Sequence, residues 1–84
     1  VPHPKYPRKA MQRGVEGYAI VELIVTVQGG VRDPILIEEN PKKMGFGKAS
    51  VKAAKKLKYT PKIVDGEAVE NPGVRFKFSF KMVP

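Results

Sequence analysis

The sequence predicts an α+β fold in which two helices pack on one face of a three-stranded antiparallel sheet. Three observations support this prediction. Apolar and polar residues alternate over residues 17–27 and again over residues 74–81, as they do in strands with one buried face. Apolar residues recur at helical spacing over residues 46–58. A glycine-rich turn at residues 28–30 connects the first strand to a returning one.

The chain begins with a proline-rich segment that should form a stiff, extended arm. Pro7 suits the first turn of a short helix that ends near Arg13, with Gly14 as its stop. A helix this short is marginal by itself, so Ala10, with Met11 as a second candidate, should contact the rest of the protein.

The segment 17–27 should supply the most buried strand of the sheet, because every second residue is apolar. That predicted core face consists of Ala19, Val21, Leu23, Val25 and Val27. The returning strand should cover residues 31–38, and Pro34 marks it as an edge strand or the site of a bulge.

Residues 46–58 should form an amphipathic helix that ends before Pro61. Its narrow face consists of small and apolar residues, which allow a close approach to the sheet, and its other faces carry lysines. The narrow face comprises Phe46, Ala49, Ala53 and Leu57, flanked by Ser50 and Ala54.

The C-terminal part of the chain should contain three further strands. Two short ones flank an Asp65-Gly66 turn within residues 62–69, and residues 71–73 form a break. The last strand has the clearest alternation in the chain. Its inward residues are Val74, Phe76, Phe78 and Phe80, and its outward residues are Arg75, Lys77, Ser79 and Lys81.

The chain of 84 residues is expected to be one domain (residues 1–84), with an arm at residues 1–7 and a globular core at residues 8–84. Its composition leaves catalysis little basis, since it has no cysteine, one histidine and two serines on regular elements. Glu38 and Glu39 would point to opposite faces and are expected to be solvated charges. We therefore expect no enzyme, cofactor or metal ion.

The formal charge of +8 arises in one block, because residues 41–64 contain eight lysines and no acid. Such a block fits a nucleic-acid-binding domain, an anionic membrane or peptidoglycan surface, or a solvated helix face. Against nucleic acid, the block has no arginine, and the phenylalanines that could stack on bases should lie in the core. An edge strand also permits a fourth interpretation, a module that binds an extended peptide.

Six short motifs occur along the chain: His-Pro-Lys-Tyr-Pro at 3–7, Gly-Val-Glu-Gly at 14–17, Lys-Tyr-Thr-Pro at 58–61, Val-Asp-Gly at 64–66, Pro-Gly-Val at 72–74 and Phe-Ser-Phe at 78–80. Together they resemble the C-terminal domain of the TonB energy-transducer family, in its short paralogue form, over nearly the whole chain. Three departures from the family pattern are His3, where the family has glutamine, Lys9, where its best-known members have arginine, and Leu57, where the family often has tryptophan.

The resemblance implies a periplasmic domain of a protein anchored in the inner membrane by a segment upstream of this chain. Such a domain binds the TonB box of outer-membrane transporters as an added strand. It transmits energy from the ExbB–ExbD complex for the uptake of iron-siderophore, haem or similar cargo, and peptidoglycan is a further candidate partner. The resemblance assigns partner contacts to His3, Pro4, Tyr6, Pro7 and Lys9 in the arm and to Val74, Arg75, Phe76, Lys77, Phe78, Ser79 and Phe80 in the last strand.

Overall fold

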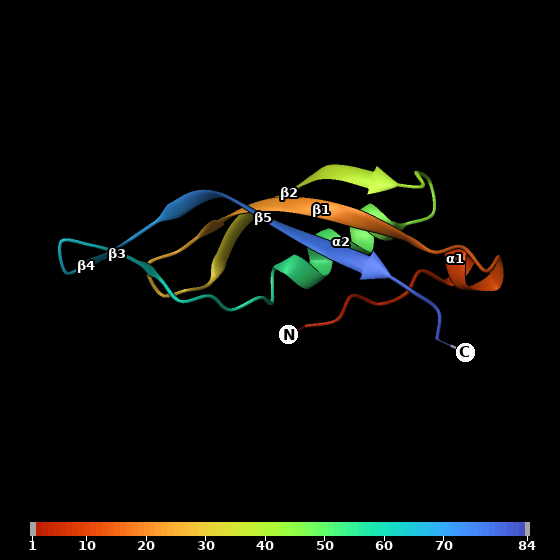
Figure 1. Cartoon of the computed structure of the whole chain (residues 1–84), viewed down its shortest axis with the longest axis horizontal. Helices are drawn as coiled ribbons and strands as arrows, with labels where there is room; N and C mark the ends of the chain where they lie inside the picture. Colours follow the sequence, from red (N-terminus) through yellow and green to blue (C-terminus); the bar gives the residue numbers. More distant parts are fainter. Residues whose placement is uncertain (1, 84) are drawn as a thin grey trace.

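The computed structural model describes residues 2–83 and confirms the predicted α+β class. One three-stranded antiparallel sheet has the order β2-β1-β5, and a separate two-stranded hairpin, β3-β4, extends from one end (Figure 1). Helix α2 packs on the sheet, while α1 lies beyond its other end. The elements are α1 (Arg8–Gln12), β1 (Gly17–Val25), β2 (Val31–Asn40), α2 (Phe46–Ala54), β3 (Lys62–Val64), β4 (Glu67–Val69) and β5 (Asn71–Phe80).

The N-terminal segment is extended up to Pro7, which precedes the first residue of α1 with φ −61° and ψ 134°. Val1, the first residue of the predicted arm, lies outside the described residues. Ala10 is fully buried as expected, whereas Met11 is 52% exposed. Gly14 has φ 66° and follows the helix as its stop.

Strand β1 lies at the centre of the sheet, and its alternating face is buried as predicted. One residue differs: Val27 was expected on that face but is 42% exposed. The reason is the turn, which begins at Thr26, one residue before Val27. The Gly29 N–H donates to the Thr26 carbonyl at 2.9 Å, and the Thr26 N–H donates to the Gly30 carbonyl at 2.9 Å.

Strand β2 forms one edge of the sheet and extends two residues past the predicted end, to Asn40. Its register with β1 shifts twice, so that it contains two bulges. One bulge places Asp33 and Pro34 opposite Leu23, and Asp33 there has φ 52°. Pro34 therefore marks both an edge strand and a bulge, as its position in the sequence indicated.

The two glutamates of β2 lie on opposite faces, but they are not solvated loop charges as expected. The Tyr18 hydroxyl donates to Glu38 on the outer face of the sheet. Glu39 is half-buried on the inner face and accepts a hydrogen bond of 3.1 Å from the Gly47 N–H, in the first turn of α2. The second contact satisfies one of the N–H groups that a helix start leaves unpaired.

Helix α2 ends at Ala54, four residues before the predicted end at Lys58. Two short-range bonds close its last turn: the Lys56 N–H donates to Ala53 at 3.0 Å and the Leu57 N–H donates to Ala54 at 3.1 Å. The chain then leaves the helix because the Tyr59 N–H donates to the Gly29 carbonyl at 2.8 Å. A longer helix would carry this segment away from that contact.

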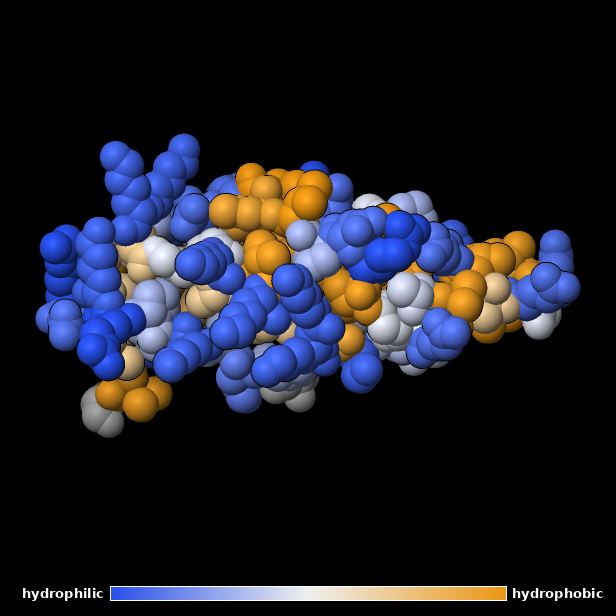
Figure 2. All heavy atoms as spheres, turned by 180° about the vertical axis from the view of Figure 1, so that it is seen from behind, coloured by the Kyte–Doolittle hydropathy of each residue, from blue (hydrophilic) through white to orange (hydrophobic). Residues whose placement is uncertain are grey.

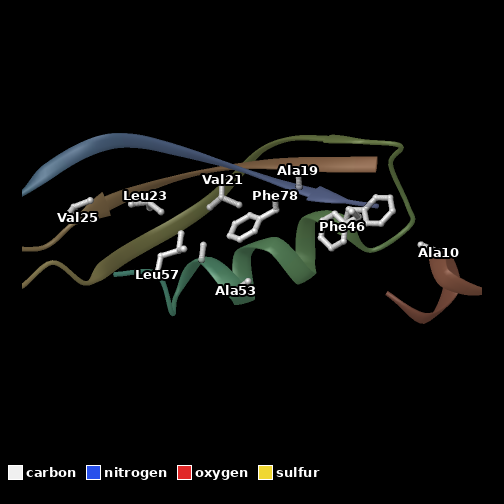
Figure 3. Close-up of a cluster of buried hydrophobic side chains, with 11 residues drawn as sticks. Ala10, Ala19, Val21, Leu23, Val25, Phe46, Ala53, Leu57 and Phe78 are labelled. Atoms are coloured by element: carbon white, nitrogen blue, oxygen red, sulfur yellow. The ribbon is translucent and has the colours of Figure 1, made fainter. Parts of the chain in front are cut away.

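The core lies between α2 and the inner face of the sheet (Figure 3). Its largest fully buried side chains are Phe46, Leu23, Val21 and Ser50. Ala53 and Ala54 let α2 approach the strands, and Leu57 closes the core at the end of the helix. The predicted narrow face of the helix is therefore confirmed except at Ala49, which is half-buried at the edge of the core.

Strand β5 includes the segment that was predicted as a break. Residues 71–73 belong to the strand, but Pro72 and Gly73 form a bulge opposite Ile24, and Gly73 has φ 73°. Before β5, Asp65 and Gly66 form the predicted turn of the β3-β4 hairpin, with φ 50° and 80°. Across the described residues, neither helix is long and apolar enough to cross a membrane.

Candidate functional site

The described part of β5 has one strand neighbour, β1, so its other edge is unpaired. Its register with β1 is continuous from Val74, opposite Leu23, to Phe80, opposite Gly17. The bulge at Pro72 and Gly73 ends this regular stretch on the N-terminal side. The predicted receptor strand therefore coincides with the regular part of β5.

The two edges of the sheet differ in how well they can pair with another strand. Edge β2 contains two bulges and a proline, devices that interrupt pairing with further chains. Edge β5 is uninterrupted over residues 74–80. An extended peptide would therefore find a regular row of main-chain donors and acceptors on β5 and an interrupted row on β2.

The side chains of β5 alternate between the core and the outer face, as predicted. Phe78 and Phe80 are buried, and Val74 and Phe76 are half-buried against the core. Phe46 is fully buried as well. Because these rings pack against the core, they are not available to stack on bases, as the nucleic-acid interpretation required.

The outer face of β5 is polar and held by contacts with β1. The Arg75 Nε donates to Glu22 Oε1 at 3.1 Å, and the Lys77 ammonium lies 4.5 Å from the centre of the Tyr18 ring. The hydrogen bond to Glu38 is the largest of the effects that raise the pKa of Tyr18, followed by partial burial. Ser79 is exposed at the end of this row.

The arm residues divide into exposed and anchored positions. His3 is exposed and Pro4 is half-buried. Pro7 lies against Gly45, where an added Cβ would come within 3.1 Å of it. The Lys9 ammonium donates to the Lys43 carbonyl at 3.1 Å, which connects α1 to the loop before α2.

Tyr6 joins the arm to β5. Its ring packs edge-on against Phe80, with centroids 5.7 Å apart, and against Phe46 at 5.9 Å. Its hydroxyl donates to the Val15 carbonyl at 2.6 Å. Partial burial and the negative charge of Glu16 raise the pKa of Tyr6. The structure thus brings the two predicted partner segments together at Tyr6 and Phe80.

A groove beside the arm was not anticipated from the sequence. It has a volume of about 590 Å³ and lies between α1 and α2, with Tyr6, Pro7, Met11 and Ala49 among its lining residues. The one available signal was Met11, an apolar residue on a helix too short to bury two side chains. The partner across the groove, Ala49, could not be inferred because the two residues are far apart in the sequence.

The chain matches known proteins over nearly its full length. Residues 2–82 match the family model described as the Gram-negative bacterial TonB protein C-terminal. The chain is 32% identical to Protein TonB of Pseudomonas aeruginosa over 79 residues, which are 94% of this chain and 22% of that protein. It is 31% identical to Protein TonB of Vibrio cholerae over 78 residues, covering 88% of this chain and 31% of that protein. The chain thus spans less than a third of either relative.

Two solved structures have the same fold. One belongs to a molecular characterization of the TonB2 protein from Vibrio anguillarum, with a TM-score of 0.71 and 39% identity. That match covers 98% of this chain and 76% of the other. The second is the solution NMR structure of the Pseudomonas aeruginosa TonB C-terminal domain, with a TM-score of 0.73 and 32% identity over 94% of this chain and 78% of that one.

Proposed function

The chain belongs to the Gram-negative TonB C-terminal family, and from this membership we propose that it is the transporter-binding domain of an inner-membrane energy transducer. It works in the periplasm, without catalysis, and binds the TonB box of outer-membrane transporters. Upstream segments of the protein anchor it in the inner membrane and connect it to the ExbB–ExbD complex. The energy it transmits drives uptake of iron-siderophore, haem or similar cargo, with peptidoglycan as a further contact.

The proposed binding mode is addition of the box segment as a strand to the free edge of β5. The observation that supports it most directly is the unbroken register of residues 74–80 on an unpaired edge. Main-chain hydrogen bonds supply the affinity in this mode, so one domain can serve several transporters. Hydrogen bonds along one strand also share a pulling force, which suits a transducer.

The arm forms the second part of the proposed interface. Tyr6 positions it against Phe80, so a ligand strand on β5 would end beside the arm. His3 is exposed there and available to a transporter, and Lys9 is exposed while its ammonium also donates to the Lys43 carbonyl. Tyr6 and Pro7 are partly occupied by packing, so we assign them to positioning of the arm as well as to contact.

The test uses a synthetic peptide carrying a TonB box, with two N-methylated versions that block either the odd or the even backbone N–H groups. Strand addition requires one set of N–H groups and leaves the other facing away. One methylated peptide should therefore lose nearly all binding in calorimetry, while the other should bind like the unmodified peptide. The amides of residues 74–80 should gain protection from hydrogen exchange, whereas those of β2 should not.

Three results would overturn this binding mode. Equal binding of both methylated peptides would exclude a ladder of main-chain hydrogen bonds. Protection confined to β2 would assign the ligand to the other edge. Failure of the unmodified peptide to bind, in a domain that is folded by circular dichroism, would exclude box recognition by this chain.

A further inference from the structure

The eight lysines of residues 41–64 have no ion-pair partner among the described residues. The salt bridges found there involve Arg32 and Arg75, on the other side of the sheet. The acids nearest to α2 are already engaged, because Glu39 binds the start of the helix. On the outer face of the sheet, the arginines of β2 and β5 therefore pair with carboxylates. On the α2 side, the positive charge of the lysines has no such balance.

Two open grooves flank the exposed side of α2. The arm groove, described above, has a volume of about 590 Å³, and its rim includes Lys5 and Arg8. The edge groove lies between α2 and β2, has a volume of about 670 Å³, and contains Leu36 and Val51 with Lys55 at its rim. Both grooves share two lysines of α2, Lys48 and Lys52.

The cationic groups therefore form two rows with apolar surface between them, a pattern we name the lysine face. One row lies on α2 and the other at the N-terminal segment, and the arm groove separates them. Met11 is 52% exposed in this groove, and an apolar patch lies over β2 beside the edge groove (Figure 2). Leu36, which lines the edge groove, is more than a third exposed. The lysine face consists of Lys5, Arg8, Lys48, Lys52 and Lys55 with Met11, Leu36, Ala49 and Val51.

We propose that the lysine face docks the domain on an anionic lipid leaflet. Its two rows of cations can contact phosphates that are spread over a planar surface. A linear polyanion would instead be matched by a single row of cations. Lysine suits such a surface because it is a compact charge that requires no fixed ligand geometry. Lysine stems and the apolar groove walls contact the headgroup boundary, while the ammonium groups reach the phosphates.

This docking surface is separate from the free edge of β5, although its arm groove is lined by Tyr6 and Pro7, which also belong to the arm part of the proposed transporter interface. The lysine face lies on the α2 side of the sheet, and the free edge of β5 lies at the side of the same sheet (Figure 1). A domain docked through α2 keeps that edge accessible. Docking would thus confine the search for a transporter to the membrane plane, yet it does not depend on box binding.

The test measures co-sedimentation of the folded domain with vesicles of phosphatidylcholine, with and without phosphatidylglycerol. Each cation near an anionic leaflet contributes about a fivefold increase in binding at low salt. The double variant Lys48→Gln/Lys52→Gln should therefore bind the anionic vesicles about 25-fold more weakly. The matched control, Lys62→Gln/Lys81→Gln, removes the same charge away from the lysine face and should bind nearly as the parent does.

A second variant separates a lipid surface from a soluble polyanion. Met11→Ser leaves every charge in place, so it should weaken vesicle binding several-fold and leave binding to a random DNA duplex unchanged. The proposal is wrong if anionic vesicles fail to bind, or if both double variants lose the same affinity. Tighter binding to the DNA than to the vesicles, with no effect of Met11→Ser on either, would assign the face to nucleic acid instead.

Discussion

At the residue scale, several side chains have roles that local sequence could not reveal. Glycine at position 17 permits a close approach, because an added Cβ would lie 2.2 Å from the Asn40 carbonyl oxygen and 2.7 Å from the Phe46 ring. Both neighbours are distant in sequence. Ser50 was correctly placed beside the narrow face of the helix, but its hydroxyl is fully buried and has no hydrogen-bond partner among the described residues.

Replacing Ser50 by alanine should stabilise the protein. The substitution removes a buried, unpaired hydroxyl and introduces the residue with the highest helix propensity. We expect the free energy of unfolding to rise by about 1 kcal/mol, and Tm by about 5 °C in a domain of this size. Thermal unfolding followed by circular dichroism measures the change. The control, Ser79→Ala, acts at an exposed strand position and should gain nothing; destabilisation by Ser50→Ala would show that the hydroxyl has a partner.

At the element scale, periodicity predicted the strands and α2 well, but it predicted their ends poorly. Helix α2 stops at Ala54 because the following chain binds Gly29, not because of a local stop signal. Its start is also stabilised from outside, by the Glu39 carboxylate of β2. A negative charge at that position interacts favourably with the helix dipole as well as with the N–H group.

The Glu39 contact predicts a measurable cost for its removal. Glu39→Ala should lower the free energy of unfolding by about 1 kcal/mol, because α2 loses a hydrogen bond and a favourable charge at its N-terminus. Urea unfolding monitored by circular dichroism tests this. Glu67→Ala makes the same charge change on the exposed hairpin and is expected to be nearly neutral. Equal effects of the two variants would show that net charge, rather than capping, determines the loss.

At the scale of the whole molecule, the three tyrosines connect separate parts of the fold, and all share one electrostatic property. Tyr6, in the arm, packs against β5, Tyr18 lies on the outer face of the sheet, and Tyr59 follows α2. The pKa of each is raised above the ordinary value. Burial is the leading cause for Tyr6 and Tyr59, and the hydrogen bond to Glu38 is the leading cause for Tyr18.

These shifts predict a loss of stability in alkali. A raised pKa means that the folded protein keeps its phenol protons when the unfolded chain has released them. Their stabilising contribution is therefore complete below a pH of about 10, the ordinary tyrosine pKa, and is lost as pH rises through the folded values. Ultraviolet absorbance should show phenolate forming at higher pH in the folded protein than in urea. Tyr6→Phe should remove one of the three shifted transitions; a single transition at the ordinary pKa would contradict the prediction.

Sequence by itself determined the fold class, the central strand, the lysine-bearing helix and the alternation of β5. Each depends on a repeat within one segment, and burial on one face of a strand or helix imposes that repeat directly. Family motifs in the sequence likewise predicted the arm and β5 as the partner-binding segments.

Pro34 marked β2 as an edge or bulged strand already in the sequence, but only the tertiary structure decided that β5 is the regular edge, where α2 ends and how the grooves of the lysine face form. Bulges depend on how two strands pair, and the contacts of Tyr6 with Phe80 and of Glu39 with Gly47 join residues far apart in the chain. No local pattern encodes such pairs, because their energy exists only once the chain has folded.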